Sequence, residues 1–484
     1  MAARVSAPTY DLAVIGGGAA GLTAAAAAAF LGAKTLLVEA ERFGGDCTWH
    51  GCVPSKTLLR AGLAAAEVRG AHRFGIDAEP HIDGARVLAR VRAIRERIYA
   101  AADAPPVLAR YGIETRLACA RFVDPHTLAI ARDGGRIVTA RRIVIATGSA
   151  PRPCVLGVPT VDTESIWDIQ RLPERLLVVG GGPVAIELAQ AFARLGVAVT
   201  VACEGPRILP RDDAAAADVV ARSLVRDGVR LRTQCRVLSA TRADGIVTAT
   251  LSDGTAVDAE LVFVAVGRVA RVADLGLERA GVAIRDGIIA VDSRGRTTAG
   301  HIYAVGDCAT TARFTHVAER MATVAVINAI VGVPTRFDPQ SITWTTFTDP
   351  ELAQVGPTEI ELRRIGRRYT VHRFAFAGLD RAIIDAAEDG FVSILASGGG
   401  RVLGGTIVGP HAGELIAEVA LARERRLSVT TLAATLHAYP TYALGVRRAA
   451  DGALVAARTP LVLAALRLLR GLRGSVPSRD AFLG

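Results

Sequence analysis

The fold class of this chain is indicated by one stretch near its N-terminus, Tyr10-Asp11-Leu12-Ala13-Val14-Ile15-Gly16-Gly17-Gly18-Ala19-Ala20-Gly21. An apolar strand over residues 10–15 runs into a GxGxxG turn, a helix is expected over residues 22–31, and a second strand over residues 35–38 ends at Glu39. Glycines in such a turn let the backbone approach a pyrophosphate, and an acid about twenty residues further on can accept hydrogen bonds from a ribose. We therefore predict a dinucleotide-binding Rossmann unit that uses Gly16, Gly18, Gly21 and Glu39.

The same pattern returns later in the chain. A strand over residues 175–179 leads into a GxGxxA turn from Gly180 through Gly182 to Ala185, before an expected helix over residues 186–195 and a strand over residues 197–202. Two Rossmann units predict two dinucleotides in one reaction, most simply FAD and a nicotinamide cofactor.

The end of that second strand bears on the choice of nicotinamide cofactor. Cys203 stands where Glu39 stands in the first unit, and Glu204 follows it. The missing acid removes a repulsion against a 2′-phosphate, and Arg207 is a candidate to bind that phosphate. The sequence favours NADPH and leaves NADH open.

Two thiols follow the first unit in Gly44-Gly45-Asp46-Cys47-Thr48-Trp49-His50-Gly51-Cys52. A Cys-x4-Cys pair closes a small loop, so its disulfide can open without unfolding the protein. The chain has 7 cysteines, an odd and scattered set that suits a reducing cytoplasm better than a secreted disulfide framework. Buried thiols or half of a zinc site are the alternative, but no second Cys/His pair with zinc-like spacing follows. We predict a redox couple and no resident metal.

Lysine usage singles out one further residue. Among 57 Lys and Arg residues, Lys34 and Lys56 are the lysines. A compact ammonium can sit against a flat ligand or modulate a thiolate, which a planar guanidinium does less well. The position of Lys56 just after the thiols favours a functional role over chance survival.

Length and charge limit the function classes. A chain of 484 residues suggests about three domains. The net charge of +10 would suit nucleic acid, but the arginines are dispersed and only 5% of residues are aromatic, so no stacking platform is visible. A positive field that attracts dinucleotides or a membrane surface explains the charge. We expect no secretion signal, no membrane-spanning helix and a cytoplasmic protein.

With these motifs in this order, the chain resembles the class I flavoprotein disulfide reductases, or pyridine nucleotide-disulfide oxidoreductases, over about residues 8–451, and in particular their mercuric reductase-like branch. Further matching segments are residues 145–149, 264–268 and 302–308. The resemblance implies an α/β fold with two Rossmann-like dinucleotide-binding domains, for FAD and NAD(P), and a C-terminal α+β dimerisation domain of a homodimer. The implied limits are 1–153 and 271–337 for the FAD domain, 154–270 for the NAD(P) domain, 338–451 for the dimerisation domain and 452–484 for a basic tail.

The resemblance also implies roles for individual residues. Cys52 would be the thiol nearer the flavin and Cys47 the outer thiol that meets the acceptor. Lys56 would lie near the reactive nitrogen of the flavin and pair with Glu187. The implied FAD residues are Gly16, Gly18, Gly21, Glu39, Gly45, Thr147, Gly148 and Asp307, and the implied NAD(P) residues are Gly180, Gly182, Ala185, Arg207 and Gly267.

The end of the dimerisation domain departs from the family pattern. Lipoamide and glutathione enzymes carry a catalytic His before Pro-Thr and a Glu shortly after, whereas this chain has Tyr439 at the His position and Leu444 in place of the Glu. Loss of a general acid/base costs about 10²- to 10⁴-fold in rate. A tyrosine there is typical of the mercuric reductase-like branch, and soft Hg(II) or Cu suits thiolates. His437 is an alternative base or a structural residue.

We therefore expect an FAD-dependent NAD(P)H oxidoreductase that reduces a metal ion or small oxidant. A dihydrolipoamide dehydrogenase-like enzyme and a membrane-surface, quinone-reducing flavoprotein remain alternatives. The last alternative rests on the tail, where Arg467, Arg470 and Arg473 are expected on one face of a leucine-rich helix limited to about three turns by Pro460 and Gly471. Such a helix lies on an anionic membrane or packs on protein.

Overall fold

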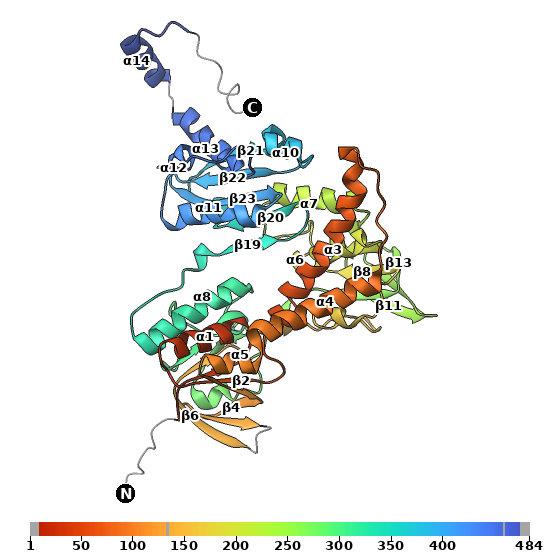
Figure 1. Ribbon diagram of the computed structural model, residues 1–484, viewed down its shortest axis with the longest axis vertical. Coiled ribbons are helices and arrows are strands. Elements are labelled where there is room, and N and C mark those ends of the chain that lie inside the picture. Colours follow the sequence, from red (N-terminus) through yellow and green to blue (C-terminus); the bar gives the residue numbers. More distant parts are fainter. Residues whose placement is uncertain (1–8, 132–134, 458–459, 475–484) are drawn as a thin grey trace.

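The computed structural model describes residues 9–131, 135–457 and 460–474. Figure 1 shows three lobes: the first Rossmann unit at the bottom, the second at the right and an antiparallel sheet at the top. The predicted fold class, two Rossmann units followed by an α+β domain, is confirmed.

The first lobe is built on a 7-stranded sheet of order β3-β2-β1-β6-β5-β4, with β18 paired to β6. Its strands are β1 Tyr10–Ile15, β2 Thr35–Glu39, β3 Ile113–Leu117, β4 Cys119–Asp124, β5 Thr127–Ala131, β6 Arg136–Ile145 and β18 Ile302–Ala304. The strands β3, β2, β1, β6 and β18 run parallel, whereas β4 and β5 pair antiparallel beside the first half of β6. From Leu12 to Ile15 the parallel strand β1 is continuously apolar, because both of its faces are covered there.

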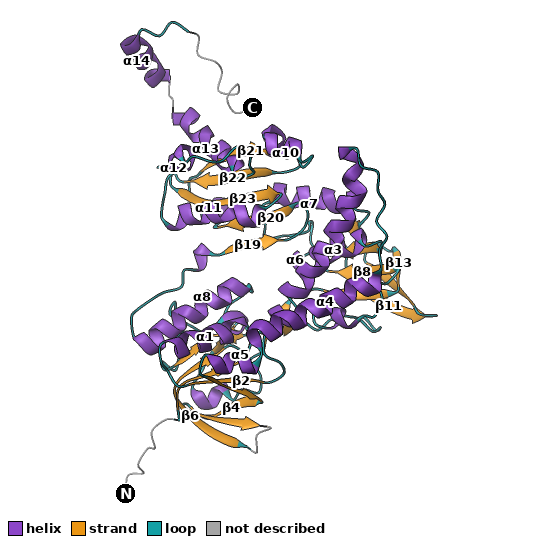
Figure 2. Cartoon of the chain, viewed as in Figure 1, coloured by secondary structure: helices purple, strands orange, loops and turns teal. Residues whose placement is uncertain are grey.

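Helices cover this sheet, as Figure 2 shows. Helix α1 (Ala19–Phe30) packs against α8 (Thr315–Val326), a helix that enters the lobe much later in the chain. Helix α1 begins inside the glycine turn, earlier than the predicted start at residue 22. The backbone of Gly18 caps it, and apolar periodicity does not reveal such a cap.

Four helices lie between β2 and β3 in the chain: α2 Gly45–Trp49, α3 Cys52–Gly70, α4 Gly84–Ile98 and α5 Pro105–Arg110. Cys47 lies on α2 and Cys52 is the first residue of α3. Helix α3 packs along α6 (Pro183–Arg194) of the second Rossmann unit. The redox pair is thereby tied to the helix that follows the second glycine turn.

The second lobe contains the parallel sheet β10-β9-β8-β14 and the antiparallel sheet β11-β12-β13. Its elements are β8 Arg175–Val179, β9 Ala198–Ala202, α7 Ala214–Arg226, β10 Arg230–Arg232, β11 Val237–Ala243, β12 Ile246–Leu251, β13 Ala256–Ala259 and β14 Leu261–Val264. A ribbon of β7 (Ser149–Pro151) and β15 (Arg268–Ala270) carries the chain between the two lobes, and β16 (Ile284–Arg285) and β17 (Ile288–Ile289) form a small hairpin after it.

The third lobe holds a 5-stranded antiparallel sheet of order β19-β20-β23-β22-β21. Its elements are β19 Thr343–Thr346, β20 Glu351–Val355, α9 Glu359–Arg364, β21 Thr370–Ala375, α10 Asp380–Ile384, β22 Phe391–Ala396, β23 Val402–Gly409, α11 Ala412–Glu424, α12 Val429–Ala434 and α13 Leu444–Ala457. Helix α13 continues across the predicted boundary between residues 451 and 452.

The last helix, α14 (Pro460–Arg470), projects beyond the third lobe in Figure 1. It ends where predicted, because Gly471 takes a left-handed φ of 62°. Arg473 therefore follows the helix, and the prediction that it shares a helical face with Arg467 and Arg470 is wrong. Among the described helices, none is both long and apolar enough to cross a bilayer.

Candidate functional site

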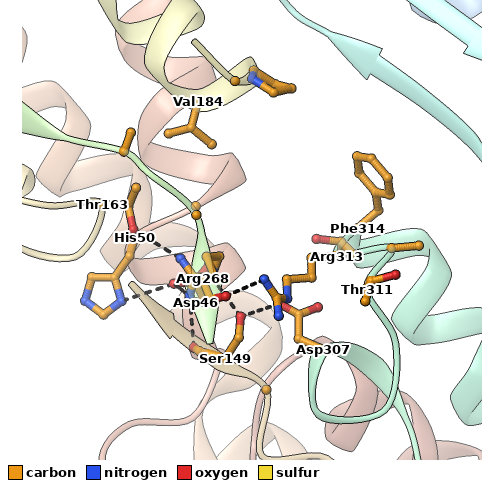
Figure 3. Close-up of a pocket in the computed structure, with 18 of the residues that line it drawn as sticks. Asp46, His50, Ser149, Thr163, Val184, Arg268, Asp307, Thr311, Arg313 and Phe314 are labelled. Atoms are coloured by element: carbon orange, nitrogen blue, oxygen red, sulfur yellow. Dashed lines mark hydrogen bonds and ion pairs between the residues drawn. The ribbon is translucent and has the colours of Figure 1, made fainter. Parts of the chain in front are cut away.

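A single cavity of about 2460 Å³ extends over all three lobes. Both glycine turns, both redox cysteines, Lys56 and Asp307 line it. Figure 3 shows its central part, where Asp307 and Arg313 face Arg268 and Asp46. The predicted dinucleotide and redox residues thus open into one space.

The first glycine turn leaves its backbone bare toward this cavity. Gly16 has a φ of 107°, and a Cβ there would lie 2.2 Å from the carbonyl oxygen of Ala146, so only glycine fits. One oxygen of Glu39 accepts a hydrogen bond from the backbone N–H of Gly17 at 2.6 Å. A bare turn at the start of α1 and a carboxylate at the end of β2 fit the pyrophosphate and ribose of FAD.

The second glycine turn has a backbone conformation like that of the first, but no acidic residue stands at the position that matches Glu39. Gly180 has a φ of 133°, and a Cβ there would lie 2.4 Å from the carbonyl oxygen of Ala265. Gly182 caps α6, and Ala185 is fully buried on its first turn. Cys203 takes the place of Glu39, directly after β9.

The expectation that Arg207 binds a 2′-phosphate is not supported by its contacts. Its guanidinium donates to the backbone oxygens of Leu209 at 2.7 Å, Asp212 at 2.8 Å and Pro210 at 3.0 Å. These donors stabilise the loop after β9. The sequence shows that Arg207 carries a positive charge, but it does not show that backbone carbonyl oxygens of the same loop accept its hydrogen bonds.

The thiols of Cys47 and Cys52 are hydrogen-bonded to each other. Cys52 opens to solvent and Cys47 is half-buried. The hydrogen bond with Cys47 is the largest cause that lowers the pKa of Cys52, to about 6, and Thr315 and the charge of Lys56 act in the same direction. The same bond, together with burial, raises the pKa of Cys47 well above its usual range. The reduced pair therefore holds one negative charge, on Cys52.

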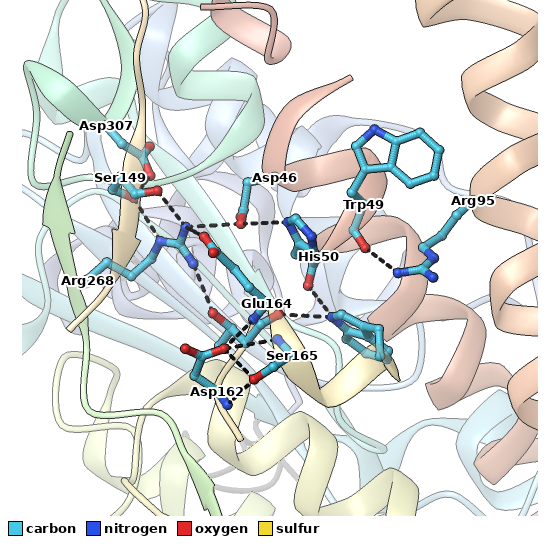
Figure 4. Close-up of polar contacts among 12 residues, drawn as sticks. Asp46, Trp49, His50, Arg95, Ser149, Asp162, Glu164, Ser165, Arg268 and Asp307 are labelled. Atoms are coloured by element: carbon cyan, nitrogen blue, oxygen red, sulfur yellow. Dashed lines mark hydrogen bonds and ion pairs between the residues drawn. The ribbon is translucent and has the colours of Figure 1, made fainter. Parts of the chain in front are cut away.

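Two long-range hydrogen bonds hold the turn between these thiols (Figure 4). Arg95 donates to the carbonyl oxygen of Trp49 at 2.8 Å, and the indole N–H of Trp167 donates to that of His50 at 2.8 Å. Sequence reasoning missed both donors, because neither stands near the Cys-x4-Cys motif.

Lys56 and Glu187 meet across the packed helices α3 and α6. Lys56 Nζ lies 2.7 Å from Glu187 Oε2, and the Glu187 side chain is only 4% exposed. The other carboxylate oxygen accepts the backbone N–H of Phe347 at 2.8 Å, and Lys56 Nζ lies 4.5 Å from the centre of the Phe347 ring. The pair expected from the sequence is thus fixed by three parts of the chain.

Arg268 links the thiol-bearing helix α2 to Asp307. One of its terminal nitrogens, an NH2 group, lies 3.0 Å from Asp46 Oδ1, and its Nε donates to Ser149 Oγ at 2.8 Å. Ser149 in turn donates to Asp307 Oδ2 at 2.6 Å, while burial raises the pKa of the Asp307 carboxyl. Arg268 is the last residue of the matching segment 264–268, but the sequence did not predict its contact with Asp46.

The carboxylates around His50 form ion pairs with arginine. Ligand atoms of Asp46, His50 and Glu164 lie within 4.8 Å of one another, as in a metal site. However, Arg268 lies 3.0 Å from Asp46 and Arg271 lies 2.9 Å from Glu164. A divalent cation there would face two guanidinium groups, so the cluster is better suited to positioning α2 than to holding a metal.

Five further predicted cofactor residues line the cavity: Gly18, Gly45, Thr147, Gly148 and Gly267. Gly21 does not line it: this glycine is buried in α1, where a Cβ would lie 1.8 Å from the carbonyl oxygen of Gly16. Gly45 begins α2 next to Gly18. Thr147 donates to the carbonyl oxygen of Arg271 at 2.6 Å, which holds the first flavin segment near the second.

The end of the third lobe offers a phenol instead of an imidazole. Tyr439 is 68% exposed, and its hydroxyl donates to Asp380 Oδ2 at 2.8 Å. This bond raises the pKa of Tyr439, so the phenol stays neutral. Leu444, at the expected Glu position, is buried in the apolar core of the lobe.

His437 is tied within its own lobe. Its Nε2 lies 3.0 and 3.1 Å from the two carboxylate oxygens of Glu418 on α11, and its Nδ1 lies 2.9 Å from the carbonyl oxygen of Thr435. Its side chain is 6% exposed. With both nitrogens engaged, this ring is placed to hold the segment that carries Tyr439.

Comparisons with known proteins agree with this arrangement. Residues 10–322 match the pyridine nucleotide-disulphide oxidoreductase family and residues 342–450 its dimerisation domain. The dihydrolipoyl dehydrogenase of Thermus scotoductus is 36% identical over 92% of this chain and 97% of its own length. The mercuric reductase of Streptomyces lividans is 35% identical, over 91% and 96%. Among solved structures, a Cu(II) complex of a mutant of RclA, an HOCl-induced flavoprotein disulfide reductase from Escherichia coli, has a TM-score of 0.81 at 25% identity and covers 91% of this chain and 98% of that one.

Proposed function

Because this chain belongs to the pyridine nucleotide-disulphide oxidoreductase family, we propose that it passes electrons from NAD(P)H to the Cys47/Cys52 disulfide and on to a metal ion or small oxidant. It is an FAD-dependent oxidoreductase, and its dimerisation domain supports the expected homodimer. The odd, scattered set of cysteines and a disulfide that has to be reduced suit the cytoplasm.

FAD held at the first glycine turn would supply hydride chemistry, linking NAD(P)H to the disulfide. Breaking the Cys47–Cys52 bond with one hydride leaves one thiol and one thiolate, which matches the single charge expected on Cys52. Delivery of two electrons, to one Hg(II) ion or to two Cu(II) ions that each become Cu(I), closes the disulfide again and releases the Cys47 proton. Lys56 and Glu187 would orient the reacting groups, and Asp307 would hold the flavin side of the site.

The observation that carries the choice of acceptor is the segment around Tyr439. An organic disulfide needs a proton when it is reduced, and a His/Glu pair supplies it in lipoamide enzymes. Here Tyr439 is a neutral phenol, Leu444 lies in the core, and His437 is engaged by Glu418 and Thr435. A metal ion accepts electrons from thiolates without a proton, so it suits this segment better.

Two relatives support the same choice. One is a mercuric reductase, and the other was solved as a Cu(II) complex. The dihydrolipoyl dehydrogenase relative supports the alternative that this chain reduces lipoamide. The two candidates differ in their need for a general acid.

An anaerobic experiment separates them. Holoenzyme is reduced with NADPH and mixed with Hg(II), Cu(II), lipoamide or a quinone while flavin reoxidation is followed. We expect fast reoxidation by metal, and lipoamide slower by about 10²- to 10⁴-fold, as for a lost general acid. The Cys47→Ser variant should lose metal turnover, whereas Cys119→Ser, at an exposed cysteine outside the pair, should keep it. Brisk lipoamide turnover with NAD would overturn the proposal.

A second candidate role concerns the tail. Leu468 and Leu469 on α14 are 86% and 78% exposed, and Arg467 and Arg470 lie on the same helix. An exposed apolar face beside arginines suits a contact with an anionic membrane surface. Full-length protein should then sediment with vesicles that contain phosphatidylglycerol, and a chain ending at residue 457, after α13, should not. Equal behaviour of the two proteins would remove this role.

A further inference from the structure

The ribose position of the second Rossmann unit lacks a carboxylate. In the first unit, Glu39 reaches the glycine turn and accepts the N–H of Gly17. In the second, the Cys203 side chain turns inward: a Cβ on Gly181 would lie 2.3 Å from its sulfur, and Cys203 is 5% exposed. A buried thiol cannot replace the two acceptor oxygens that a ribose diol meets in an NADH site.

The segment 234–236, which follows β10, is joined by backbone hydrogen bonds to the chain just after β9. The N–H of Cys235 donates to the carbonyl oxygen of Cys203 at 2.9 Å, and the N–H of Gln234 donates to that of Gly205 at 2.8 Å. Arg236 follows immediately, and its own N–H is held by Ser252 Oγ at 3.0 Å. The backbone that carries Arg236 is therefore fixed beside the end of β9.

Arg236 has a guanidinium with donors to spare. It lines the cavity together with Glu204 and Arg211, and its side chain is 58% exposed. Among the described residues, the contact recorded for this guanidinium is with Glu204 Oε1 at 3.8 Å, which is too long for a hydrogen bond. Arg207, in contrast, has its donors on three carbonyl oxygens.

We propose that Arg236 binds the 2′-phosphate of NADPH and makes this chain prefer NADPH to NADH. The proposal rests on the assignment of the second glycine turn to the nicotinamide cofactor. A guanidinium binds a phosphate through two parallel hydrogen bonds, which its loose contact with Glu204 does not use. The Glu204 side chain is 77% exposed, so it can turn into solvent when the phosphate takes its place.

The opposite assignment is equally concrete. If Glu204 accepted hydrogen bonds from the ribose diol, Arg236 would only neutralise it and NADH would be preferred. The two assignments predict opposite effects of the 2′-phosphate on binding.

Calorimetry on the FAD-loaded protein distinguishes them. The probes are adenosine 2′,5′-bisphosphate and 5′-AMP, which differ only in the 2′-phosphate. Wild-type protein should bind the bisphosphate at least about tenfold more tightly, and Arg236→Ala should lose about that factor while binding 5′-AMP within about twofold of wild type. Arg232→Ala, an exposed arginine at the end of β10, is the matched control and should change neither.

A second variant keeps the test independent of Arg236. Glu204→Gln removes the competing carboxylate, so it should tighten the bisphosphate about twofold or more and leave 5′-AMP unchanged. Equal binding of the two probes by wild-type protein, or an equal loss of both in Arg236→Ala, would overturn the proposal. A Cys47→Ser protein, which cannot pass electrons to an acceptor, should still bind both probes as the wild type does. The binding experiment therefore tests the role of Arg236 separately from the proposed acceptor chemistry.

Discussion

Lys56 Nζ lies 2.7 Å from Glu187 Oε2, although the two residues are 131 positions apart in the chain. The contact exists because α3, which begins with Cys52, packs along α6, which begins at the second glycine turn. The contact places one positive and one negative side chain beside the thiol of Cys52. Their effect can be measured as a shift of the pKa of Cys52.

The thiolate of Cys52 should persist down to a pH well below the one at which an ordinary thiolate is protonated. Its lowered pKa of about 6 means that the charged form is present above pH 6 and is lost as the pH falls through that value. We expect the thiolate-to-flavin charge-transfer absorbance of the two-electron-reduced holoenzyme to titrate with a midpoint near pH 6. Cys47→Ala removes the main hydrogen bond and should move the midpoint upward, whereas Cys47→Ser keeps a donor and should move it less. A midpoint above pH 8 in the wild type would contradict this assignment.

Charges at Lys56 and Glu187 should shift the same titration in opposite directions. Lys56 lowers the pKa of Cys52 and Glu187 raises it. Lys56→Met should therefore move the midpoint upward by about one pH unit or less, and Glu187→Gln should move it downward. The other lysine supplies the control: Lys34 lies over the ring of Tyr10, so Lys34→Met should leave the midpoint in place. Shifts of the same sign in both site variants would argue against a Coulombic cause.

His437 should behave as a positioning residue. Its Nε2 lies 3.0 Å from a carboxylate oxygen of Glu418, and the two side chains are 6% and 29% exposed. His437→Gln and Glu418→Gln should each lower the free energy of unfolding by about 1–3 kcal/mol, and the double variant should cost less than their sum. Flavin reduction by NADPH should be unchanged in all three. A large loss of turnover in His437→Gln without a loss of stability would instead identify this histidine as the missing acid/base.

Arg194 should be a main electrostatic tie between the second and third lobes. Its Nε lies 2.8 Å from Asp227 and a terminal nitrogen lies 2.8 Å from Asp349, with the Arg194 side chain 8% exposed. Arg194→Met leaves both carboxylates without this cation, so we expect a loss of about 3 kcal/mol in urea unfolding. The exposed pair of Arg226 and Asp389 is the matched control, and Arg226→Met should cost less than about 1 kcal/mol. Similar losses in the two variants would mean that burial does not set the strength of the tie.

The secondary structure near the glycine turns follows closely from local patterns. The strand predicted over residues 10–15 is β1, and that predicted over residues 175–179 is β8. Both helices begin earlier than predicted, because backbone capping by Gly18 and Gly182 leaves no trace in the apolar periodicity. The helical face predicted for Arg473 was wrong for a related reason: the helix stops at a left-handed glycine.

Side-chain partners were harder to predict. Arg207 has the charge that a phosphate needs, but the loop after β9 folds so that three carbonyl oxygens take its donors. Arg236 has no motif around it, and its backbone lies beside the end of β9 because the N–H of Cys235 donates to the carbonyl oxygen of Cys203. Glu418 likewise meets His437 only through the placement of α11.

Local sequence patterns alone are enough to identify two Rossmann units, a dithiol beside the first and a tyrosine where a catalytic histidine is expected. Strands, glycine turns and a Cys-x4-Cys spacing depend on residues close together in the chain, so their pattern is legible without a fold. The folded chain was needed to show that Lys56 meets Glu187 and that Arg268 reaches Asp46. It was also needed to show that the loop after β9 engages Arg207. The first two contacts join segments far apart in the chain, and they depend on how helices, strands and loops pack against one another over their whole surfaces. The bonds of Arg207 reach only two to five residues along the chain and depend on the backbone course of one loop.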